Sequence, residues 1–294
     1  MTFRWVCAIG INLIWSLSYP VSVLVMKDIS PAALAFWRVF GAAVFLLPFV
    51  RRKDIPKKLL IRDLLGLVAM GVVGCAAAFA LQYAGTARST SSNVSMLVGL
   101  ESVMITVLAA VFLKERIGPR SILCLAVAFA GAALVTVDPV TLSVLSSRYL
   151  IGNALMVLSL VCYASYTVLG KGLSPRWGAS ALSALPFGFA ALVTLPAMAY
   201  WRPMELVRAF HLSGAEAAGI AFLAVGATAL GYLVWNWLLQ SMRAGALSYS
   251  LYLQPVAGAL FSGWLLGEKL PPTYFLGSAL ILGALIFEQV SSSE

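Results

Sequence analysis

Charged side chains are scarce in this sequence, and their scarcity excludes a soluble protein. Asp, Glu, Lys and Arg make up 11% of the 294 residues and hydrophobic residues make up 61%, whereas soluble domains carry about 25% charged residues. The mean hydropathy of +0.95 agrees. Because a spanning helix needs about 20 apolar residues to cross ~30 Å of hydrocarbon, the length suits about ten spans and leaves no room for a soluble domain.

Residues that carry metal, redox or acid–base chemistry are also few. The single histidine, His211, lies in an expected external loop, and the four cysteines all lie within apolar runs, where a thiol acts as a small hydrophobic group. The sequence contains no HExxH motif, no pair of intramembrane aspartates and no GxxxxGK[ST] phosphate-binding loop. We therefore expect no metal, cofactor or disulfide framework, and neither an intramembrane enzyme nor an ATP-driven pump.

Apolar windows between charged or Pro/Gly-rich breaks predict ten membrane-spanning helices. They run near residues 4–26, 31–50, 64–84, 90–113, 121–137, 149–170, 179–200, 216–239, 245–266 and 272–288. The first window has no cleavage site of the signal-peptide kind and is followed at once by another window, so we expect it to be retained as a span.

The basic residues predict the orientation of these spans. The net charge of +9 is spread between apolar runs, which favours topology-setting charge over nucleic-acid binding. When alternate loops are grouped, one side holds thirteen Lys and Arg residues and the other holds six, with most of the bias in the loop at 51–62. Because positively charged loops face the cytoplasm, both termini are predicted to be cytoplasmic.

Two short patterns recur in the second half of the chain. Residues 27–31 (Lys-Asp-Ile-Ser-Pro) resemble residues 171–175 (Lys-Gly-Leu-Ser-Pro), 144 positions later, and residues 112–116 resemble residues 265–269, 153 positions later. We therefore expect two five-span repeats, at 1–140 and 147–290, followed by a short tail at 291–294. Because five is odd, the second repeat enters the membrane from the opposite side, which is typical of alternating-access transporters. The predicted fold is an all-α membrane protein of two inverted five-helix repeats.

The same halves contain short sequence motifs that are similar to those of a known family. Ile-Ser-Pro at 29–31 leads to Ala-Phe-Trp-Arg-Val-Phe-Gly-Ala-Ala at 35–43 and to Ala-Leu-Gln-Tyr at 80–83. Two similar motifs, Leu-Lys-Glu-Arg-Ile at 113–117 and Leu-Gly-Glu-Lys-Leu at 266–270, complete the pattern. With them the chain resembles the drug/metabolite transporter superfamily, and within it the ten-span EamA-type carriers, over nearly its whole length. The resemblance implies a multi-pass carrier of the cell (inner) membrane that exports an amino acid or a related amphipathic compound.

Ionisable residues inside spans are the first candidates for a substrate site, because a charge in hydrocarbon costs at least a few kcal/mol. Glu101 lies roughly 16 Å below the outer end of the fourth span, close to the midplane. The repeat offset aligns it with Gln254 in the ninth span. Glu101 is expected either to bind a proton or a cationic group of the substrate, or to form a structural hydrogen bond. These carriers usually have a proline in the fourth span, where this chain has Ser102.

Arg38, Pro20 and Pro255 are expected to have gating or structural roles. Arg38 lies about 10 Å below the outer end of the second span, so it can either snorkel to the surface or pair with Glu101. Pro20 and Pro255 each remove a helical hydrogen bond, which makes each a hinge or a packing kink. The ninth span keeps this proline, as in the family.

Aromatic and amide residues at similar depth complete the candidate site. Their ring faces and amides can hold an apolar or cationic ligand, although any single ring in such a position is more often a core or lipid-facing residue. The predicted substrate-binding residues besides Glu101 and Gln254 are Trp15, Tyr19, Asn93, Tyr163, Tyr166, Trp235, Asn236 and Tyr252.

These observations favour a secondary transporter, with proton exchange as one means of coupling. The alternatives are an intramembrane enzyme, which would need a nucleophile, an acid–base pair or metal ligands at a shared depth, and a channel, which would need a polar ring or a filter loop. The expected partners are a small-molecule substrate and the lipid bilayer, without nucleic acid. Gly131, Gly277 and Gly283 in the fifth and tenth spans suit close helix packing, either within the scaffold or at a homodimer contact.

Overall fold

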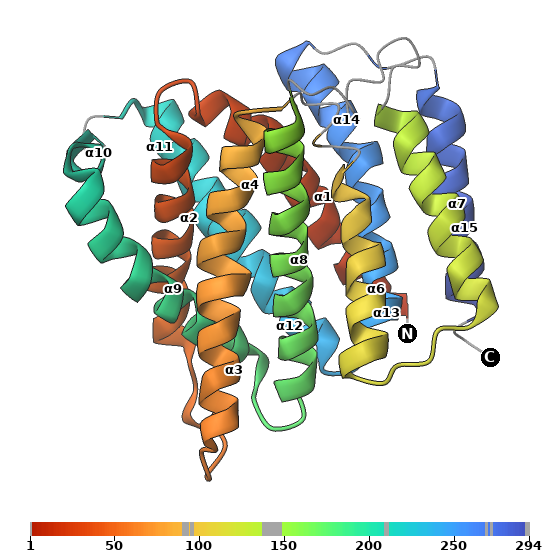
Figure 1. Ribbon diagram of the computed structural model, residues 1–294, viewed down its shortest axis with the longest axis horizontal. Helices are drawn as coiled ribbons and strands as arrows, with labels where there is room; N and C mark the ends of the chain where they lie inside the picture. The colour runs from red at the N-terminus through yellow and green to blue at the C-terminus, as the bar shows by residue number, and fades with distance from the viewer. Residues whose placement is uncertain are drawn as a thin grey trace.

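The computed structural model describes residues 2–89, 94, 97–136, 149–208, 212–267, 270 and 273–291, and these residues form helices joined by short turns, with no strand among them. The helices run side by side, and their connections lie at two opposite ends of the bundle (Figure 1). The all-helical prediction is therefore confirmed for this part of the chain.

The helices of the first half begin and end close to the predicted bounds, except that α6 begins ten residues after the start of the predicted window at 90–113, a start that lies outside the described residues. They are α1 (Thr2–Val25), α2 (Pro31–Leu46) with η1 (Leu47–Phe49), η2 (Arg52–Asp54), α3 (Ile61–Gly71), η3 (Val72–Ala77), α4 (Ala78–Thr86), α6 (Leu100–Phe112) and α7 (Pro119–Thr136). Ser30 and Pro31 start α2 as their sequence suggests, because the Ser30 hydroxyl accepts from the Ala33 amide at 3.2 Å and proline needs no hydrogen bond at the first helical position.

The helices of the second half agree equally well with the predicted windows. They are α8 (Leu150–Leu173), α9 (Ala179–Trp201), α10 (Pro203–Arg208), α11 (Gly214–Ala221), η7 (Phe222–Leu230), α12 (Gly231–Leu239), α13 (Ala244–Ser248), η8 (Tyr249–Tyr252), α14 (Leu253–Leu266) and α15 (Tyr274–Ser291). Ser213 and Glu216 cap α11 reciprocally, which satisfies amides at the start of the helix.

Six helical segments among the described residues are long and apolar enough to cross a membrane, and three shorter apolar helices accompany them. The helical segment from Ala244 to Leu266 is divided by the 3-10 segment η8, shortly before Pro255. Pro255 has no N–H group to donate to the Leu251 carbonyl, four residues earlier. In a 3-10 turn a carbonyl bonds to the amide three residues later instead, so this geometry suits the segment before a proline. Helix α1, in contrast, continues through Pro20 without a break in the helix.

Two continuous helical segments, Ile61–Thr86 and Gly214–Leu239, contain π-helical turns that the sequence did not predict. η3 joins α3 to α4, and η7 joins α11 to α12. Val72 and Phe222, the first residues of these segments, lie 150 positions apart, close to the repeat offsets in the sequence. π-Helical turns in proteins are often associated with functional sites, and η3 and η7 lead directly into α4 and α12.

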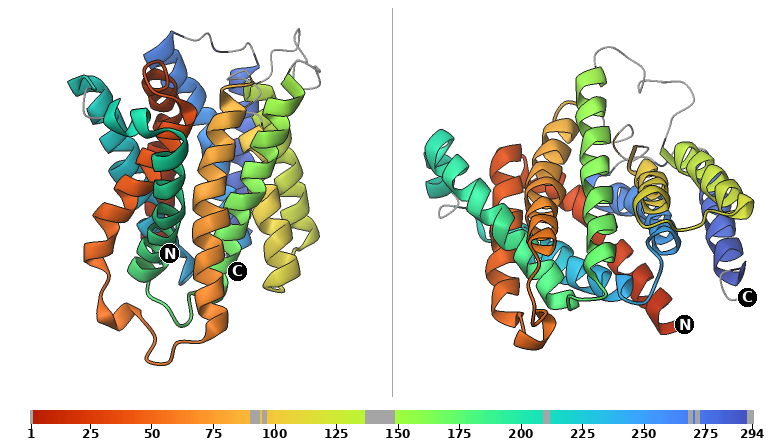
Figure 2. Two further views of the ribbon diagram at one scale, coloured as in Figure 1. Left: turned by 60° about the vertical axis from the view of Figure 1, so that its left-hand side comes forward. Right: turned by 60° about the horizontal axis from the view of Figure 1, so that its bottom comes forward.

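Helices α7 and α15 pack against each other at one side of the bundle (Figure 2). A Cβ atom on Gly131 would lie 2.7 Å from the Gly277 carbonyl oxygen, so only glycine allows this approach. Of the glycines expected to pack closely, these two therefore meet within the chain, whereas a Cβ on Gly283 would meet no atom within 4 Å.

Candidate functional site

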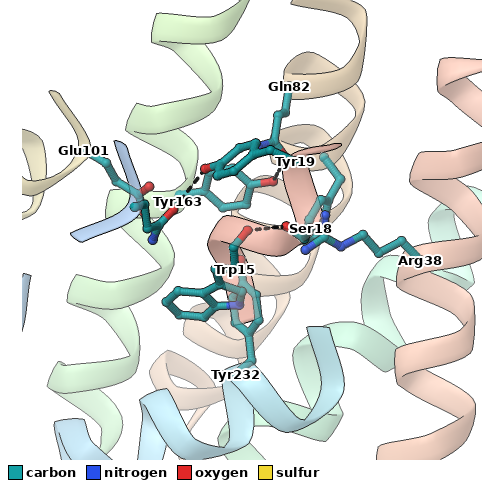
Figure 3. Close-up of a pocket in the computed structure, with 10 residues that line it drawn as sticks. Trp15, Ser18, Tyr19, Arg38, Gln82, Glu101, Tyr163 and Tyr232 are labelled. Atoms are coloured by element: carbon teal, nitrogen blue, oxygen red, sulfur yellow. Dashed lines mark hydrogen bonds between the residues drawn. The ribbon is translucent and has the colours of Figure 1, made fainter. Parts of the chain in front are cut away.

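A small polar cavity lies among the central helices of the bundle, and both halves of the chain line it (Figure 3). Its volume is about 50 Å³, which is room for a few water molecules but not for an amino acid. The lining residues are Trp15, Ser18 and Tyr19 from α1, Arg38 from α2, Phe79 and Gln82 from α4, Glu101 from α6, Tyr163 from α8, Tyr232 from α12 and Gln254 from α14.

Helix α1 presents one face to this cavity. Trp15, Ser18 and Tyr19 are spaced three and four residues apart, which places them on the same side of a helix. The opposite face of α1 carries exposed apolar side chains such as Ile9 and Leu13. Helix α1 therefore lies between the cavity and an apolar surface.

Arg38 enters the cavity from α2 and is buried. Its Nε donates to the Thr228 hydroxyl at 2.6 Å and its Nη1 to the Tyr83 hydroxyl at 2.8 Å, and the guanidinium lies 4.6 Å from the centre of the Phe79 ring. No hydrogen bond or ion pair joins it to Glu101 in the described part of the chain. Of the alternatives considered for Arg38, the structure therefore shows neither snorkelling nor direct pairing with Glu101.

Glu101 faces Arg38 across the cavity (Figure 3). It lies in the first turn of α6 and is half-buried. No described residue forms a hydrogen bond or an ion pair with its carboxyl group. A structural hydrogen bond to a neighbouring span is therefore not seen among these residues.

Two tyrosine–glutamine hydrogen bonds cross the cavity. The Tyr163 hydroxyl on α8 donates to the Gln82 side-chain oxygen on α4 at 2.8 Å, and the Tyr19 hydroxyl on α1 donates to the Gln254 side-chain oxygen on α14 at 3.0 Å. The Gln254 amide donates in turn to Asn12 at 2.9 Å. Each crossing bond joins a helix of the first half to a helix of the second half, so relative movement of the halves would change both bonds.

Aromatic rings close the lower side of the cavity as Figure 3 draws it. Trp15 lies 5.7 Å from Tyr232 and 5.4 Å from Trp235, measured between ring centres. The Trp15 indole also donates to the Ala227 carbonyl within η7 at 2.7 Å and packs directly on Gly231. The π-helical segment thus positions the indole that forms this side of the cavity.

A second small cavity continues from the first. It shares Ser18, Tyr19, Arg38 and Gln82 with the central cavity and has a volume of about 40 Å³. Its other lining residues include Pro20 and Ser22 in α1, Tyr83 and Thr86 in α4, Ser262 and Leu266 in α14, and Val94. The nearer ends of these three helices lie at the top of Figure 1. The polar space therefore extends toward this end of the bundle.

Several predicted site residues lie elsewhere. The Asn236 side-chain amide donates to Tyr166 at 2.7 Å and to Ser183 at 2.9 Å, in a buried network away from the cavity lining. Trp235 lies behind Trp15 and donates to Thr167. These three predicted residues, Tyr166, Trp235 and Asn236, therefore do not line the cavity in this structure.

Two further predictions have different outcomes. The Tyr252 hydroxyl donates to the Leu125 carbonyl at 3.3 Å, so this ring packs between η8 and α7 and not at the cavity. Asn93 lies outside the described residues. Pro255 follows the cavity residue Gln254 directly in α14.

Four lining residues were not predicted: Ser18, Phe79, Gln82 and Tyr232. Gln82 had only a weak signal, because it lies two residues inside the end of the third predicted window, 64–84, where a polar side chain can also reach the membrane interface. Phe79 and Tyr232 had none, since aromatic residues in a membrane helix face lipid, core or cavity with the same sequence pattern.

Comparisons with known proteins identify relatives along the whole chain. An uncharacterized transporter of Archaeoglobus fulgidus is 26% identical over 90% of this chain and 88% of its own length. A probable terminal-alkyne amino-acid exporter of Streptantibioticus cattleyicolor is 26% identical over 94% of this chain and 90% of its own. A solved structure aligns with a TM-score of 0.75 over 97% of this chain and 98% of its own at 14% identity, which shows a shared fold.

The EamA-like transporter family model matches the chain twice, at residues 4–137 and 150–287. Each match contributes helices to the central cavity: α1, α2, α4 and α6 come from the first, and α8, α12 and α14 come from the second. The relatives named for a function are transporters, and none of these is named as an enzyme. The chain belongs to the EamA-like transporter family and is a multi-pass membrane protein.

Proposed function

We propose that this protein is a secondary active exporter of an amino acid or a closely related zwitterion, and that it works by alternating access to the central cavity. The observation that carries the proposal is the placement of Arg38 and Glu101 on opposite sides of one cavity without a bond between them (Figure 3). A cavity with one positive and one negative side chain is complementary to a molecule that carries both charges.

The two charged groups differ in what they can bind. The Arg38 Nη2 group donates no hydrogen bond to a described residue, so it is free to bind a carboxylate, for which guanidinium groups have a matching geometry. The Glu101 carboxyl group suits an ammonium group. Phe79, Trp15 and Tyr232 supply aromatic faces for the remainder of the ligand. The relative named a probable amino-acid exporter supports this choice of substrate class.

We infer that ten helices cross the membrane and that both termini are cytoplasmic. The segment from Ala244 to Leu266 and the shorter apolar helices supply the spans beyond the six long ones. The end of the bundle at the bottom of Figure 1 carries the basic loop at 51–62 and both ends of the chain. That end would face the cytoplasm under the positive-inside rule.

The two family matches would then be inverted repeats around the cavity. η3 and η7 have similar positions, each within the third long helical segment of its family match, and this similarity supports an inverted repeat. Because the cavity of about 50 Å³ excludes an amino acid, substrate binding requires the two halves to move apart. The aromatic side of the cavity would open toward the cytoplasm, and the side with the second small cavity would open outward.

Proton exchange follows from the same carboxyl group. Glu101 can hold a proton or an ammonium group, but not both at once. Competition between the two for one site would return a proton to the cytoplasm for each substrate released outside. This coupling requires only that the empty carrier reorients after protonation.

Transport by purified protein in liposomes tests the proposal. Radiolabelled amino acids should accumulate in counterflow, which a channel does not support, and Glu101→Gln should abolish the dependence of transport on a pH gradient. Glu205→Gln is the matched control, since Glu205 lies in α10 and pairs with exposed Arg202 away from the cavity. Unchanged, pH-dependent transport by Glu101→Gln would refute the coupling, and absence of counterflow with any amino acid would refute the substrate class.

A further inference from the structure

A lateral groove between α3 and α6 lies apart from the central cavity, at the end of the bundle that carries the loop at 51–62. Helix α8 lies between α3 and α6 in both figures and forms the floor of the groove (Figures 1 and 2). The groove has a volume of about 540 Å³, within the range of ligand sites in proteins. It is therefore large enough for a ligand in the described structure, unlike the central cavity.

The walls of the groove are apolar over most of their length. Leu108 and Phe112 come from α6, and Val168, Leu169 and Leu173 come from α8. Glycine at position 172 leaves the floor open, because a Cβ atom there would meet only Leu113, at 3.6 Å. This part of the groove suits a hydrocarbon chain.

Charged residues lie only at the end of the groove nearest the loops. They are Arg62 and Asp63 at the start of α3 and Arg176 after α8. Asp63 is buried, and its carboxylate accepts hydrogen bonds from Arg176 and from the Trp177 indole. Arg62, whose side chain is 76% exposed, lies 3.7 Å from the same carboxylate. Two arginines therefore face one aspartate, and the mouth of the groove keeps a net positive charge.

We propose that this groove binds an anionic phospholipid, with the headgroup phosphate at Arg62 and one acyl chain along α8. The separation of charge and hydrocarbon along the groove matches a molecule with one anionic end and a long apolar part. Exposed Lys57 and Lys58 precede Arg62 in the chain and add positive charge near the same end. Basic pockets between helices at the cytoplasmic side of a membrane favour anionic lipid headgroups. The proposal does not depend on the substrate of the central cavity.

Native mass spectrometry of the full-length protein with added phosphatidylglycerol or phosphatidylcholine tests the site. The wild type should retain phosphatidylglycerol preferentially, and Arg62→Gln should weaken that binding about fivefold, the factor that corresponds to ~1 kcal/mol for one basic residue near a lipid surface. Arg51→Gln, an exposed basic residue outside the groove, is the matched control and should change the binding little.

A second pair of variants tests the apolar part. Gly172→Phe should fill the groove and reduce retention of both lipids, whereas Gly118→Phe, at an exposed position without atoms near its Cβ, should not. Equal retention of the two lipids by the wild type, or equal losses for Arg62→Gln and Arg51→Gln, would overturn the proposal. Full lipid retention by folded Gly172→Phe would also overturn it.

Discussion

Replacing Gly231 with alanine should destabilise the protein by forcing Trp15 out of its position. The new Cβ atom would lie 2.6 Å from the Trp15 Nε1 atom and 3.2 Å from Cε2, and the indole is held by its 2.7 Å hydrogen bond to the Ala227 carbonyl. Overpacking of this kind costs about 1–3 kcal/mol, and loss of the hydrogen bond adds about 1 kcal/mol. The better helix propensity of alanine offsets about 1 kcal/mol, which leaves a net destabilisation of about 2 kcal/mol.

Thermal unfolding of purified protein in detergent measures this loss. At about 2–4 °C per kcal/mol, Gly231→Ala should lower the apparent Tm by about 4–8 °C. Gly258→Ala is the control, because a Cβ atom at Gly258 in α14 would meet no atom within 4 Å and only the propensity gain remains. The Gly258 variant should therefore be as stable as the wild type or more stable.

A double-mutant cycle separates the contact with Trp15 from other effects of the alanine. In a Trp15→Phe background the clashing Nε1 atom and its hydrogen bond are both absent, so Gly231→Ala should cost less than it does in the wild type. An equal cost in both backgrounds, or a Gly231→Ala protein with the apparent Tm of the wild type, would refute the role assigned to this contact.

Three other predictions address orientation, the crossing bonds and the ligand. Cysteines introduced at Lys27 and Pro175, in a background without native cysteines, should react with impermeant reagents from opposite sides of the membrane; labelling from one side would refute the inverted repeats. Tyr163→Phe, which leaves the Gln82 oxygen without its donor, should raise the transport KM several-fold, whereas Tyr252→Phe, away from the cavity, should not; equal KM values would contradict the assigned lining. In a thermal-shift screen, amino acids should raise the apparent Tm more than sugars or quaternary amines, and the reverse order would exclude a zwitterion site.

Much of the fold could be predicted from the sequence because the bilayer imposes a simple constraint on composition. The predicted window at 179–200, for example, agrees with α9 within one residue at each end. Polar residues inside those windows were equally visible, and Glu101, Arg38 and Gln254 all line the cavity. Their burial is costly wherever it occurs, so position along the chain was sufficient to identify them.

Whether an aromatic side chain points toward the cavity, the protein core or lipid could not be predicted in the same way. Tyr163 lines the cavity, whereas Tyr166, three residues later in the same helix, bonds to Asn236 and Leu182. Lipid and protein core are both apolar, so the sequence gives no contrast between the faces of a membrane helix. The π-helical segments were missed for a related reason, since their extra residue per turn depends on packing, such as the contact of Gly74 with Tyr166, and not on a local residue pattern.

The distribution of charge around the cavity has a consequence for substrate orientation. Both charged residues, Arg38 and Glu101, belong to the first family match, whereas the second contributes neutral Tyr163, Tyr232 and Gln254. If the matches are inverted repeats, a two-fold axis would allow a ligand to bind in two equivalent orientations. The unequal charges remove that equivalence, because only one orientation brings a carboxylate to Arg38 and an ammonium group to Glu101. A zwitterion would therefore bind in a single orientation in both the inward-open and the outward-open form.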